Sequence, residues 1–188
     1  MIDIDILRKQ IRKSFSKKRA EHIFGCEKTA ALLAAKYGGD KYTVRLCALL
    51  HDITKEKNHE EQLKLCKEYG IILDNAELYV PELIHAVTGA HVALHIYGVG
   101  LREFDAIRYH TTGRANMTML EKIIYISDSI EPERSYDGVD DIRKAAMKDL
   151  DEAMRLALDR SILFLIKKKK IIHTDTIGAR NYLYEKRL

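Results

Sequence analysis

The chain has 188 residues, of which 46% are apolar and 32% charged, and its formal net charge is +4. This length suits one domain with a substantial core. No apolar stretch approaches the roughly 18 residues that a membrane-spanning helix needs, and the acidic start Met1–Asp5 does not resemble a secretory signal, so we expect a cytoplasmic protein without a membrane partner. The modest charge suits a small polyanionic ligand. Nucleic-acid binding is not expected, because no basic stripe is interleaved with aromatic residues and Trp is absent.

The sequence predicts an all-α fold. Only ten Gly and two Pro are available for turns, and long runs of Leu, Ile, Ala, Glu, Lys and Arg recur with helical spacing. Helices are predicted over 3–14, from the 14–17 junction to 37, from 41 into the segment that ends at 51 and 52, and from about 60 to 69. Further helices are predicted over 81–97, 101–110, 118–131, 142–147, 149–166 and 174–185, while 71–80 is left unassigned. No repeat or linker divides the chain, so one domain is expected.

Several predicted helix ends have a local cause. Gly38 and Gly39 stop the second helix, because glycine readily adopts the left-handed conformation at a helix C-terminus. Asp40 is the expected N-cap of the third helix, and Pro81 suits the first turn of a later one.

The third predicted helix ends in His51 and Asp52. Its apolar stripe consists of Val44, Cys47, Ala48 and His51, at i, i+3, i+4 and i+7, so the imidazole continues a buried face. Asp52 follows about 100° further round the helix. A carboxylate beside an imidazole at a buried helix end is unfavourable unless a cation or several hydrogen-bond donors compensate it. From this pair alone, a salt-bridged helix end and a metal site are equally good interpretations.

Four histidines and two aspartates fall on predicted buried helix faces or at helix ends. They are His22, His51, Asp52, His85, His110 and Asp128, and Asp128 continues an apolar stripe through Met117, Leu120 and Ile124. A single buried histidine is more often a hydrogen-bonded core residue than a ligand. Six such groups in an all-α chain are hard to satisfy one by one. A shared divalent metal would satisfy the imidazoles and carboxylates together.

A second histidine pair competes with this interpretation. His91 and His95 have the i, i+4 spacing that also chelates metals. However, neither has an acidic residue within one turn, and both flank the helix face that carries His85. We therefore favour the six-residue cluster as the metal site.

The three cysteines show no metal-binding or redox motif. Cys26, Cys47 and Cys66 are widely spaced and form no close pair, which favours reduced fillers of helix faces. Cys26 lies one turn beyond His22 and could bind a metal, but packing in the core is the simpler interpretation.

Five segments share their order and spacing with a known enzyme family. They are Arg19–His22, His51–Lys55, Ala106–Gly113, Asp128–Arg134, and His173–Thr176 followed by Ala179–Leu183. Together they resemble the YqeK family of metal-dependent HD-domain phosphohydrolases, over nearly the whole chain from Arg19 to Tyr184. The His-Asp dipeptide alone is a weak signal, whereas the ordered set is specific. The resemblance implies an all-α, single HD-domain helical bundle.

The resemblance also implies a role for each matching residue. His22, His51, Asp52 and Asp128 would hold the metal. The phosphates would be contacted by Arg19, Lys55, His85, His110, Thr111 and Arg134, with His22 and Asp128 bordering the substrate. Catalysis would fall to Asp52, Lys55, His85 and His110. The loop formed by Ile171, Ile172, His173, Thr174, Asp175 and Thr176 would close over the nucleotide.

Members of that family hydrolyse diadenosine tetraphosphate symmetrically to two ADP and use iron, so the same reaction and metal are expected here. The mixed imidazole and carboxylate ligands would also suit Mn, Co or Zn. Ile23 and Cys26 replace the family's usual Thr and Val, and Ala86-Val87 stands where Gly-Pro is common, which leaves the substrate fit open. The alternatives are an HD phosphohydrolase of another nucleotide, such as a nucleotidase or alarmone hydrolase, a non-catalytic nucleotide-binding regulatory module, and a helical protein without metal.

The expected domain spans residues 1–188. Its core would cover about 16–135, and C-terminal helices within 139–188 would pack on this core and close the nucleotide site. The protein could form a homodimer.

Overall fold

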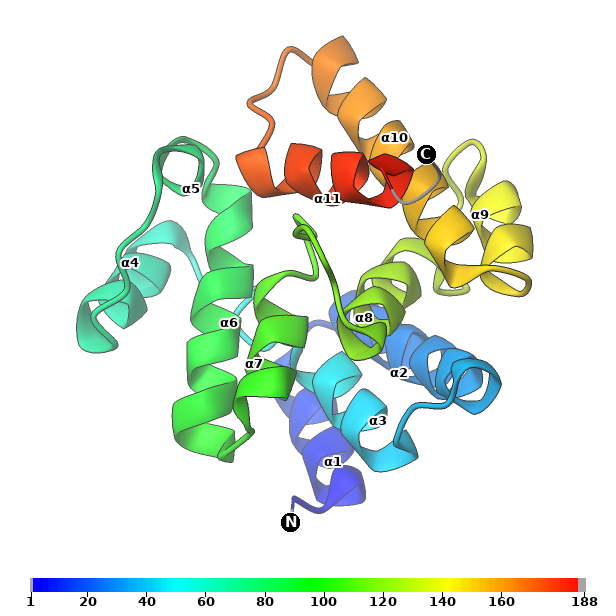
Figure 1. The fold of residues 1–188 in the computed structure, drawn as a ribbon. Helices are drawn as coiled ribbons and strands as arrows, with labels where there is room; N and C mark the ends of the chain where they lie inside the picture. The colour runs from blue at the N-terminus through cyan, green and yellow to red at the C-terminus, as the bar shows by residue number, and fades with distance from the viewer. Residues whose placement is uncertain (1, 186–188) are drawn as a thin grey trace.

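The computed structural model describes residues 2–185, and over this range the chain is helical without any strand (Figure 1). The helices are α1 (Ile4–Ser14), α2 (Lys17–Tyr37), α3 (Lys41–Leu50), α4 (His59–Glu68), α5 (Asn75–Tyr79), α6 (Pro81–Tyr97), α7 (Leu101–Arg108), α8 (Met119–Ile130), α9 (Val139–Ala146), α10 (Leu150–Lys167) and α11 (Thr174–Glu185). The predicted all-α class is confirmed. The expected extent of 1–188 also includes residues 1 and 186–188, which lie outside the described residues.

Most helix ends are set by residues next to them. Gly38 ends α2 with φ of 82°, as predicted, because this left-handed conformation is unstrained only without a Cβ. The Asp40 side chain accepts a hydrogen bond from the Thr43 backbone N–H and caps α3. Asn58 and Thr118 begin α4 and α8 with reciprocal capping boxes, so the first backbone N–H groups of these helices are satisfied locally.

Two predicted boundaries need correction. The helix that was expected to carry His51 and Asp52 ends at Leu50, and a tight turn follows it. His51 keeps right-handed helical angles (φ −56°, ψ −35°), so the imidazole still continues the buried stripe. The unassigned stretch 71–80 contains the short helix α5, which starts at an Asp74–Glu77 capping box that the apolar pattern alone did not reveal.

The core lies between α2, α3 and α8, and α7 adds to it from the side (Figure 1). Ile23, Leu49, Ile107 and Ile123 have no exposed surface. Burying an aliphatic side chain of this size contributes about 1.5–3 kcal/mol relative to leaving it in water. This packing brings together the first turns of α2, the end of α3 and the last turn of α8.

The turn after α3 is held by buried polar side chains. The Thr54 hydroxyl donates to the backbone carbonyl of His85 at 2.9 Å, and Gln62 Nε2 donates to the Thr54 carbonyl at 2.9 Å. Thr88 Oγ1 donates in turn to Gln62 Oε1 at 2.6 Å. Because every partner is buried, this network fixes the turn against α6 and α4.

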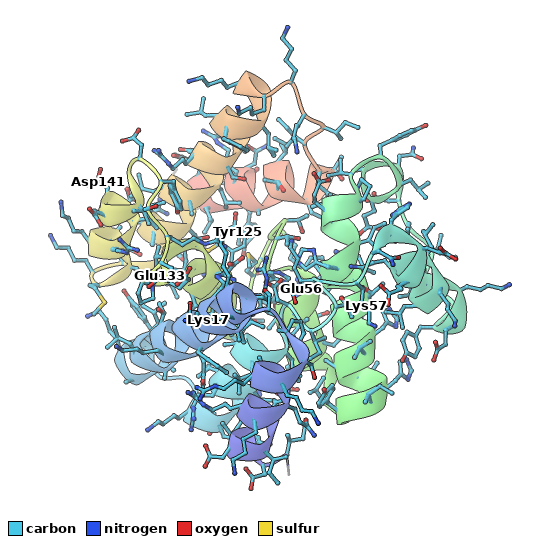
Figure 2. All side chains as sticks on the ribbon, turned by 180° about the vertical axis from the view of Figure 1, so that it is seen from behind. Lys17, Glu56, Lys57, Tyr125, Glu133 and Asp141 are labelled. Carbon is cyan, nitrogen blue, oxygen red and sulfur yellow. The ribbon has the colours of Figure 1, made fainter. Side chains whose placement is uncertain are left out.

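On the far side of the molecule the same turn is tied to the start of α2. Ser16, the N-cap of α2, donates to the Glu56 carboxylate through both its backbone N–H and its hydroxyl. Lys17 and Glu56 mark this junction near the middle of Figure 2. The turn is therefore anchored to α6 and α4 through Thr54 and to the start of α2 through Glu56.

The C-terminal helices form the remaining part of the molecule. α10 contacts α8, α9 and α11. The three C-terminal helices α9, α10 and α11 lie at the end of the molecule opposite α1 (Figure 1). Across the described residues, every helix is too short or too polar to cross a bilayer.

Candidate active site

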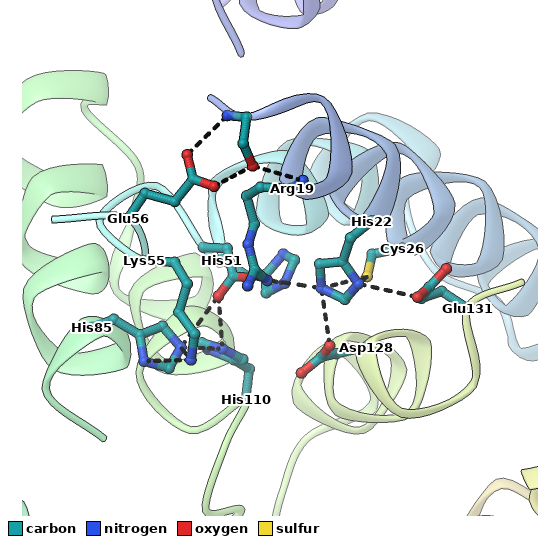
Figure 3. A network of polar contacts seen from close by, with 12 residues as sticks. Arg19, His22, Cys26, His51, Lys55, Glu56, His85, His110, Asp128 and Glu131 are labelled. Atoms are coloured by element: carbon teal, nitrogen blue, oxygen red, sulfur yellow. Dashed lines mark hydrogen bonds and ion pairs between the residues drawn. The ribbon is translucent and has the colours of Figure 1, made fainter. Parts of the chain in front are cut away.

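Four histidines and two aspartates from several helices meet in one cluster, and Figure 3 labels the four histidines and Asp128. His22 comes from α2, His51 and Asp52 from the turn directly after α3, His85 from α6, His110 from the turn after α7, and Asp128 from the last turn of α8. All are buried except the Asp128 side chain, which is 21% exposed. The structure thus brings together all six residues that the sequence predicted to form one cluster.

Each of the four imidazoles is held through its Nδ1 atom. His51 Nδ1 contacts the Ala48 carbonyl at 2.7 Å, His85 Nδ1 the Glu82 carbonyl at 2.6 Å, His110 Nδ1 the Ile107 carbonyl at 2.7 Å, and His22 Nδ1 the Glu131 carboxylate at 3.1 Å. Because these oxygens only accept, each Nδ1 must carry the proton and donate it. In a neutral imidazole the Nε2 lone pair then faces the cluster, as a metal ligand requires.

Asp52 lies at the centre of the four rings. Its Oδ2 is 3.4 Å from His51 Nε2 and 3.6 Å from His22 Nε2. Its Oδ1 is 3.2 Å from His85 Nε2 and 3.7 Å from His110 Nε2. One carboxylate therefore serves two histidine pairs, one with each oxygen. Arg19 Nη1 donates to Oδ2 at 2.5 Å and supplies a permanent positive charge.

Asp128 closes the cluster from α8. Its Oδ1 lies 3.2 Å from His22 Nε2 and accepts from Arg134 Nη2 at 2.5 Å. Arg134 also donates from Nε to the Asp128 carbonyl at 2.9 Å, which fixes the guanidinium beside the carboxylate. The arrangement keeps Asp128 anionic and leaves one side of it open to solvent.

The charges in this cluster depend on one another. Burial alone would raise the pKa of Asp52, but His51, His110 and His85 hold it well below its usual range. Burial alone would lower the pKa of His22, but its hydrogen bond to Asp128 raises that pKa to about 10. Burial lowers the pKa of His85 to about 4. Without metal, at neutral pH, His22 is a cation whose proton a metal ion must displace, whereas His85 is neutral.

The residues present fit a divalent metal. His51 Nε2 is buried without a hydrogen-bond partner, which is unfavourable for a polar atom. His85 Nε2 and His110 Nε2 lie 3.1 Å apart, and both face Asp52. Because the two nitrogens and the carboxylate all accept hydrogen bonds, a proton or a cation is needed between them. The cluster contains two of the groups whose donor atoms all lie within 4.8 Å of one another. One group is His22, Cys26, His51 and Asp128, and the other is His51, Asp52 and His110. Mixed nitrogen and oxygen donors of this kind suit divalent transition metals.

Glu131 orients His22, a role that sequence analysis missed. Its side chain is buried, and Oε1 lies 3.1 Å from His22 Nδ1 while Oε2 accepts from the Glu133 backbone N–H at 2.8 Å. A Cβ on Gly25 would lie 2.6 Å from Glu131 Oε2, so only glycine allows this approach. The signal in the sequence was an acidic residue three positions after Asp128, followed by proline.

Replacing Glu131 with Gln should weaken metal binding by about 10–100-fold, because carboxylates that orient a ligating histidine make contributions of this size. Titration of the metal-free protein with Co²⁺ against a competing chelator measures the change. Glu133→Gln, at an exposed carboxylate two residues on, is the matched control and should bind as the unchanged protein does. Equal affinity in Glu131→Gln would show that the contact does not position His22.

Positively charged side chains surround the cluster. Arg19 and Arg134 contact the two aspartates, and Lys55 Nζ lies 3.3 Å from His85 Nε2. Burial lowers the pKa of Lys55. Thr111 Oγ1 is buried without a hydrogen-bond partner and is available to a ligand. The sequence predicted all four residues as phosphate contacts, and the structure places Arg19, Lys55 and Arg134 in contact with residues of the cluster.

The segment 171–176 differs from the predicted loop, because its last three residues, Thr174, Asp175 and Thr176, form the first turn of α11. His173 is buried and its Nε2 lies 2.7 Å from Asp74 Oδ2, at the start of α5. Just before the segment, Lys170 pairs with Glu82 in the first turn of α6, the turn that holds His85. The segment thus passes the end of α6 that carries the site.

The competing pair His91 and His95 forms a stack with Tyr69. The ring centroids of Tyr69 and His95 are 4.8 Å apart, and those of His91 and His95 are 5.9 Å apart. Within residues 2–185, no third histidine, cysteine or acidic side chain joins this pair to make a donor group. The pair is an aromatic stack on the surface of α6.

Comparison with known proteins agrees with this arrangement. The HD domain family profile matches residues 19–133. The chain is 37% identical to the symmetrical bis(5'-nucleosyl)-tetraphosphatase of Bacillus subtilis strain 168, over 92% of this chain and 93% of that protein, and 35% identical to the enzyme of the same name from Staphylococcus aureus strain NCTC 8325, over 96% and 94%. A crystal structure described as a predicted HD superfamily hydrolase involved in NAD metabolism, from Clostridium acetobutylicum, superposes with a TM-score of 0.94 at 37% identity and covers 99% of both chains. The chain therefore belongs to the HD domain family and, within it, to the YqeK-type group that its motifs resemble.

Proposed function

We propose that the protein hydrolyses diadenosine tetraphosphate symmetrically to two ADP at a divalent metal centre. The observation that carries this proposal is the convergence of four imidazole Nε2 atoms on Asp52, beside Arg19 and Lys55. The bacterial relatives that match nearly the whole chain are named for the same reaction on bis-nucleosyl tetraphosphates. A nucleotide polyphosphate also suits the cationic rim of the site.

The metal ligands in this proposal are His22, His51, Asp52 and Asp128, as predicted from the sequence. Iron is the proposed metal, and Mn, Co and Zn suit the same donors. When bound, such an ion supplies an acidified water as nucleophile and polarises the attacked phosphoryl group. Glu131 keeps the His22 Nε2 lone pair directed at the ion, through its contact with Nδ1.

The remaining residues would position the phosphates and move protons. Arg19 and Arg134 offer planar guanidinium groups for bidentate contacts with phosphate oxygens, whereas Lys55 acts as a point charge. Thr111, whose hydroxyl lacks a partner, would donate to a further phosphate oxygen. These cationic groups offset charge on the transferring phosphoryl group and on the ADP leaving group.

His85 and His110 face the second oxygen of Asp52. Because burial lowers the pKa of His85 to about 4, its Nε2 is an acceptor at neutral pH. We assign it to accepting a hydrogen bond from Lys55 or from a water beside the substrate, and His110 to the leaving phosphate. A second metal ion held by this pair is the alternative, and metal stoichiometry distinguishes the two arrangements.

The C-terminal part of the chain would cover the nucleotide. Ile171, Ile172 and His173 lie between α10 and α11, and the segment from Ile171 to Thr176 passes the start of α6. Closure of this segment over the nucleotide stays a prediction, and so does the division into a core of about 16–135 and C-terminal helices that close the site. A cytoplasmic location, a homodimer and the absence of nucleic-acid binding also stay predictions.

Incubation of the iron-loaded protein with diadenosine tetraphosphate, followed by chromatography of the products, tests the proposal. ADP as the only nucleotide product is expected. AMP together with ATP, or no turnover in the presence of metal, would reject symmetrical hydrolysis. A parallel panel of nucleoside phosphates and alarmones would detect a different phosphohydrolase, and a nucleotide that stays bound and intact with metal present would indicate a regulatory binding module.

A further inference from the structure

Cys26 differs from the other two cysteines in what its sulfur faces. All three are free and buried. The Cys26 Sγ atom lies 3.6 Å from Nε2 and 3.9 Å from Nδ1 of His22, one helical turn away on α2 (Figure 3). It also lies within 4.8 Å of donor atoms of His51 and Asp128. Among the described residues, neither Cys47 nor Cys66 belongs to such a donor group.

A second observation points to a ligand at the same place. His51 is 1% exposed, and its Nε2 has no hydrogen-bond partner although it belongs to the same donor group as the sulfur. An unsatisfied nitrogen of this kind is costly unless something occupies the space in front of it. Core packing would explain a buried thiol, but it would not explain the unpartnered Nε2 atom of His51 in the same donor group.

The donor spacing is compatible with one ion. Donors bound at about 2.0–2.3 Å around a divalent metal lie about 3.0–3.8 Å apart. His22 Nε2 is 3.2 Å from Asp128 Oδ1 and 3.6 Å from Cys26 Sγ, within this range. The sulfur is slightly closer to Nε2 of His22, at 3.6 Å, than to Nδ1, at 3.9 Å.

We propose that Cys26 is a further ligand of the metal centre and that this centre therefore binds thiophilic divalent ions through a sulfur. The inference rests on the metal centre of the proposed function. Binding replaces the S–H bond with a sulfur–metal bond and releases one proton to solvent, with no change in oxidation state. A thiolate among imidazoles and carboxylates favours Zn²⁺, Co²⁺ or Cd²⁺ over the harder Mg²⁺ and Mn²⁺.

Titration of the metal-free full chain with Co²⁺ tests this inference by absorption spectroscopy. A near-ultraviolet thiolate-to-cobalt charge-transfer band is expected in the unchanged protein and in Cys66→Ala, the control that removes a buried thiol outside the donor group. The band should be absent from Cys26→Val and Cys26→Ser, although both should still bind Co²⁺ through the remaining donors. Affinity for Cd²⁺ should fall at least about tenfold in Cys26→Val. Tenfold is the smallest loss expected from removing a residue that only hydrogen-bonds a metal ligand, and a direct ligand should contribute at least as much.

The outcomes separate this inference from the proposed function. Co²⁺ that binds with its visible bands but without a charge-transfer band would overturn the sulfur ligand and leave the hydrolase proposal intact. A charge-transfer band in a protein that does not cleave diadenosine tetraphosphate would support the sulfur ligand and reject the reaction. Failure to bind Co²⁺ or Cd²⁺ at all would reject both the centre and its sulfur.

Discussion

Asp52→Asn is expected to abolish metal retention and to lower the rate of hydrolysis on the order of 10³-fold or more. This loss is larger than the loss in rate that follows removal of a single hydrogen-bond donor from an active site. The reason is the central position of Asp52, since each of the four imidazole Nε2 atoms lies within 3.7 Å of one Asp52 oxygen and Arg19 pairs with Oδ2. The amide removes the negative charge without changing the shape. Metal analysis and initial rates measure the two effects.

The same substitution should also destabilise the metal-free protein. Asp52 is 3% exposed, so Arg19 and the histidines would lose a buried counter-charge. Removing one partner of a buried ion pair costs about 3–5 kcal/mol in free energy of unfolding. Asp40→Asn is the matched control at the other end of α3, because Asn caps a helix as well as Asp. A metal-binding, active Asp52→Asn variant would contradict the assignment of Asp52 as the central ligand.

Asp128→Ala should also remove metal and activity, but with a much smaller loss of stability. The Asp128 side chain is 21% exposed and its partner Arg134 is 39% exposed, so water can solvate the arginine after truncation. Helical content measured by circular dichroism should therefore stay close to that of the unchanged protein. This separation of metal loss from unfolding is the expected signature of a ligand at the open side of the site.

Asp105→Ala provides the control for Asp128→Ala. Asp105 also pairs with a partly exposed arginine, Arg114, but lies on α7 away from the donor groups. It should retain metal and hydrolysis. If Asp128→Ala keeps both as well, the ligand set predicted from the sequence is wrong at this position.

The helices could be predicted from sequence because their causes are local. Apolar periodicity over many residues, Gly38, Asp40 and Pro81 identify elements and ends without reference to the rest of the chain. The short helix α5 escaped this approach, since five residues carry too little periodicity. The end of α3 was misplaced because a tight turn keeps His51 in helical angles, so the side-chain pattern continues past the last helical hydrogen bond.

The candidate site was predicted as a set of residues and not as a geometry. Motif order and buried stripes named His22, His51, Asp52 and Asp128, but spacing along a helix says nothing about a neighbouring helix. Glu131 was missed because its role depends on Gly25, which lets a carboxylate from the end of α8 reach a ring on α2.

By itself, the sequence determined the helical class, most helix limits and which histidines and acids lie on apolar faces, because these follow from propensity and period. Only the tertiary structure decided which of these side chains contact one another. The packing of α2 on α3 and α8 set which oxygen of Asp52 faces which histidine pair, and it brought the Cys26 sulfur within 4.8 Å of donor atoms of His51 and Asp128. These are contacts between segments distant in the chain, and their distances depend on how whole helices pack.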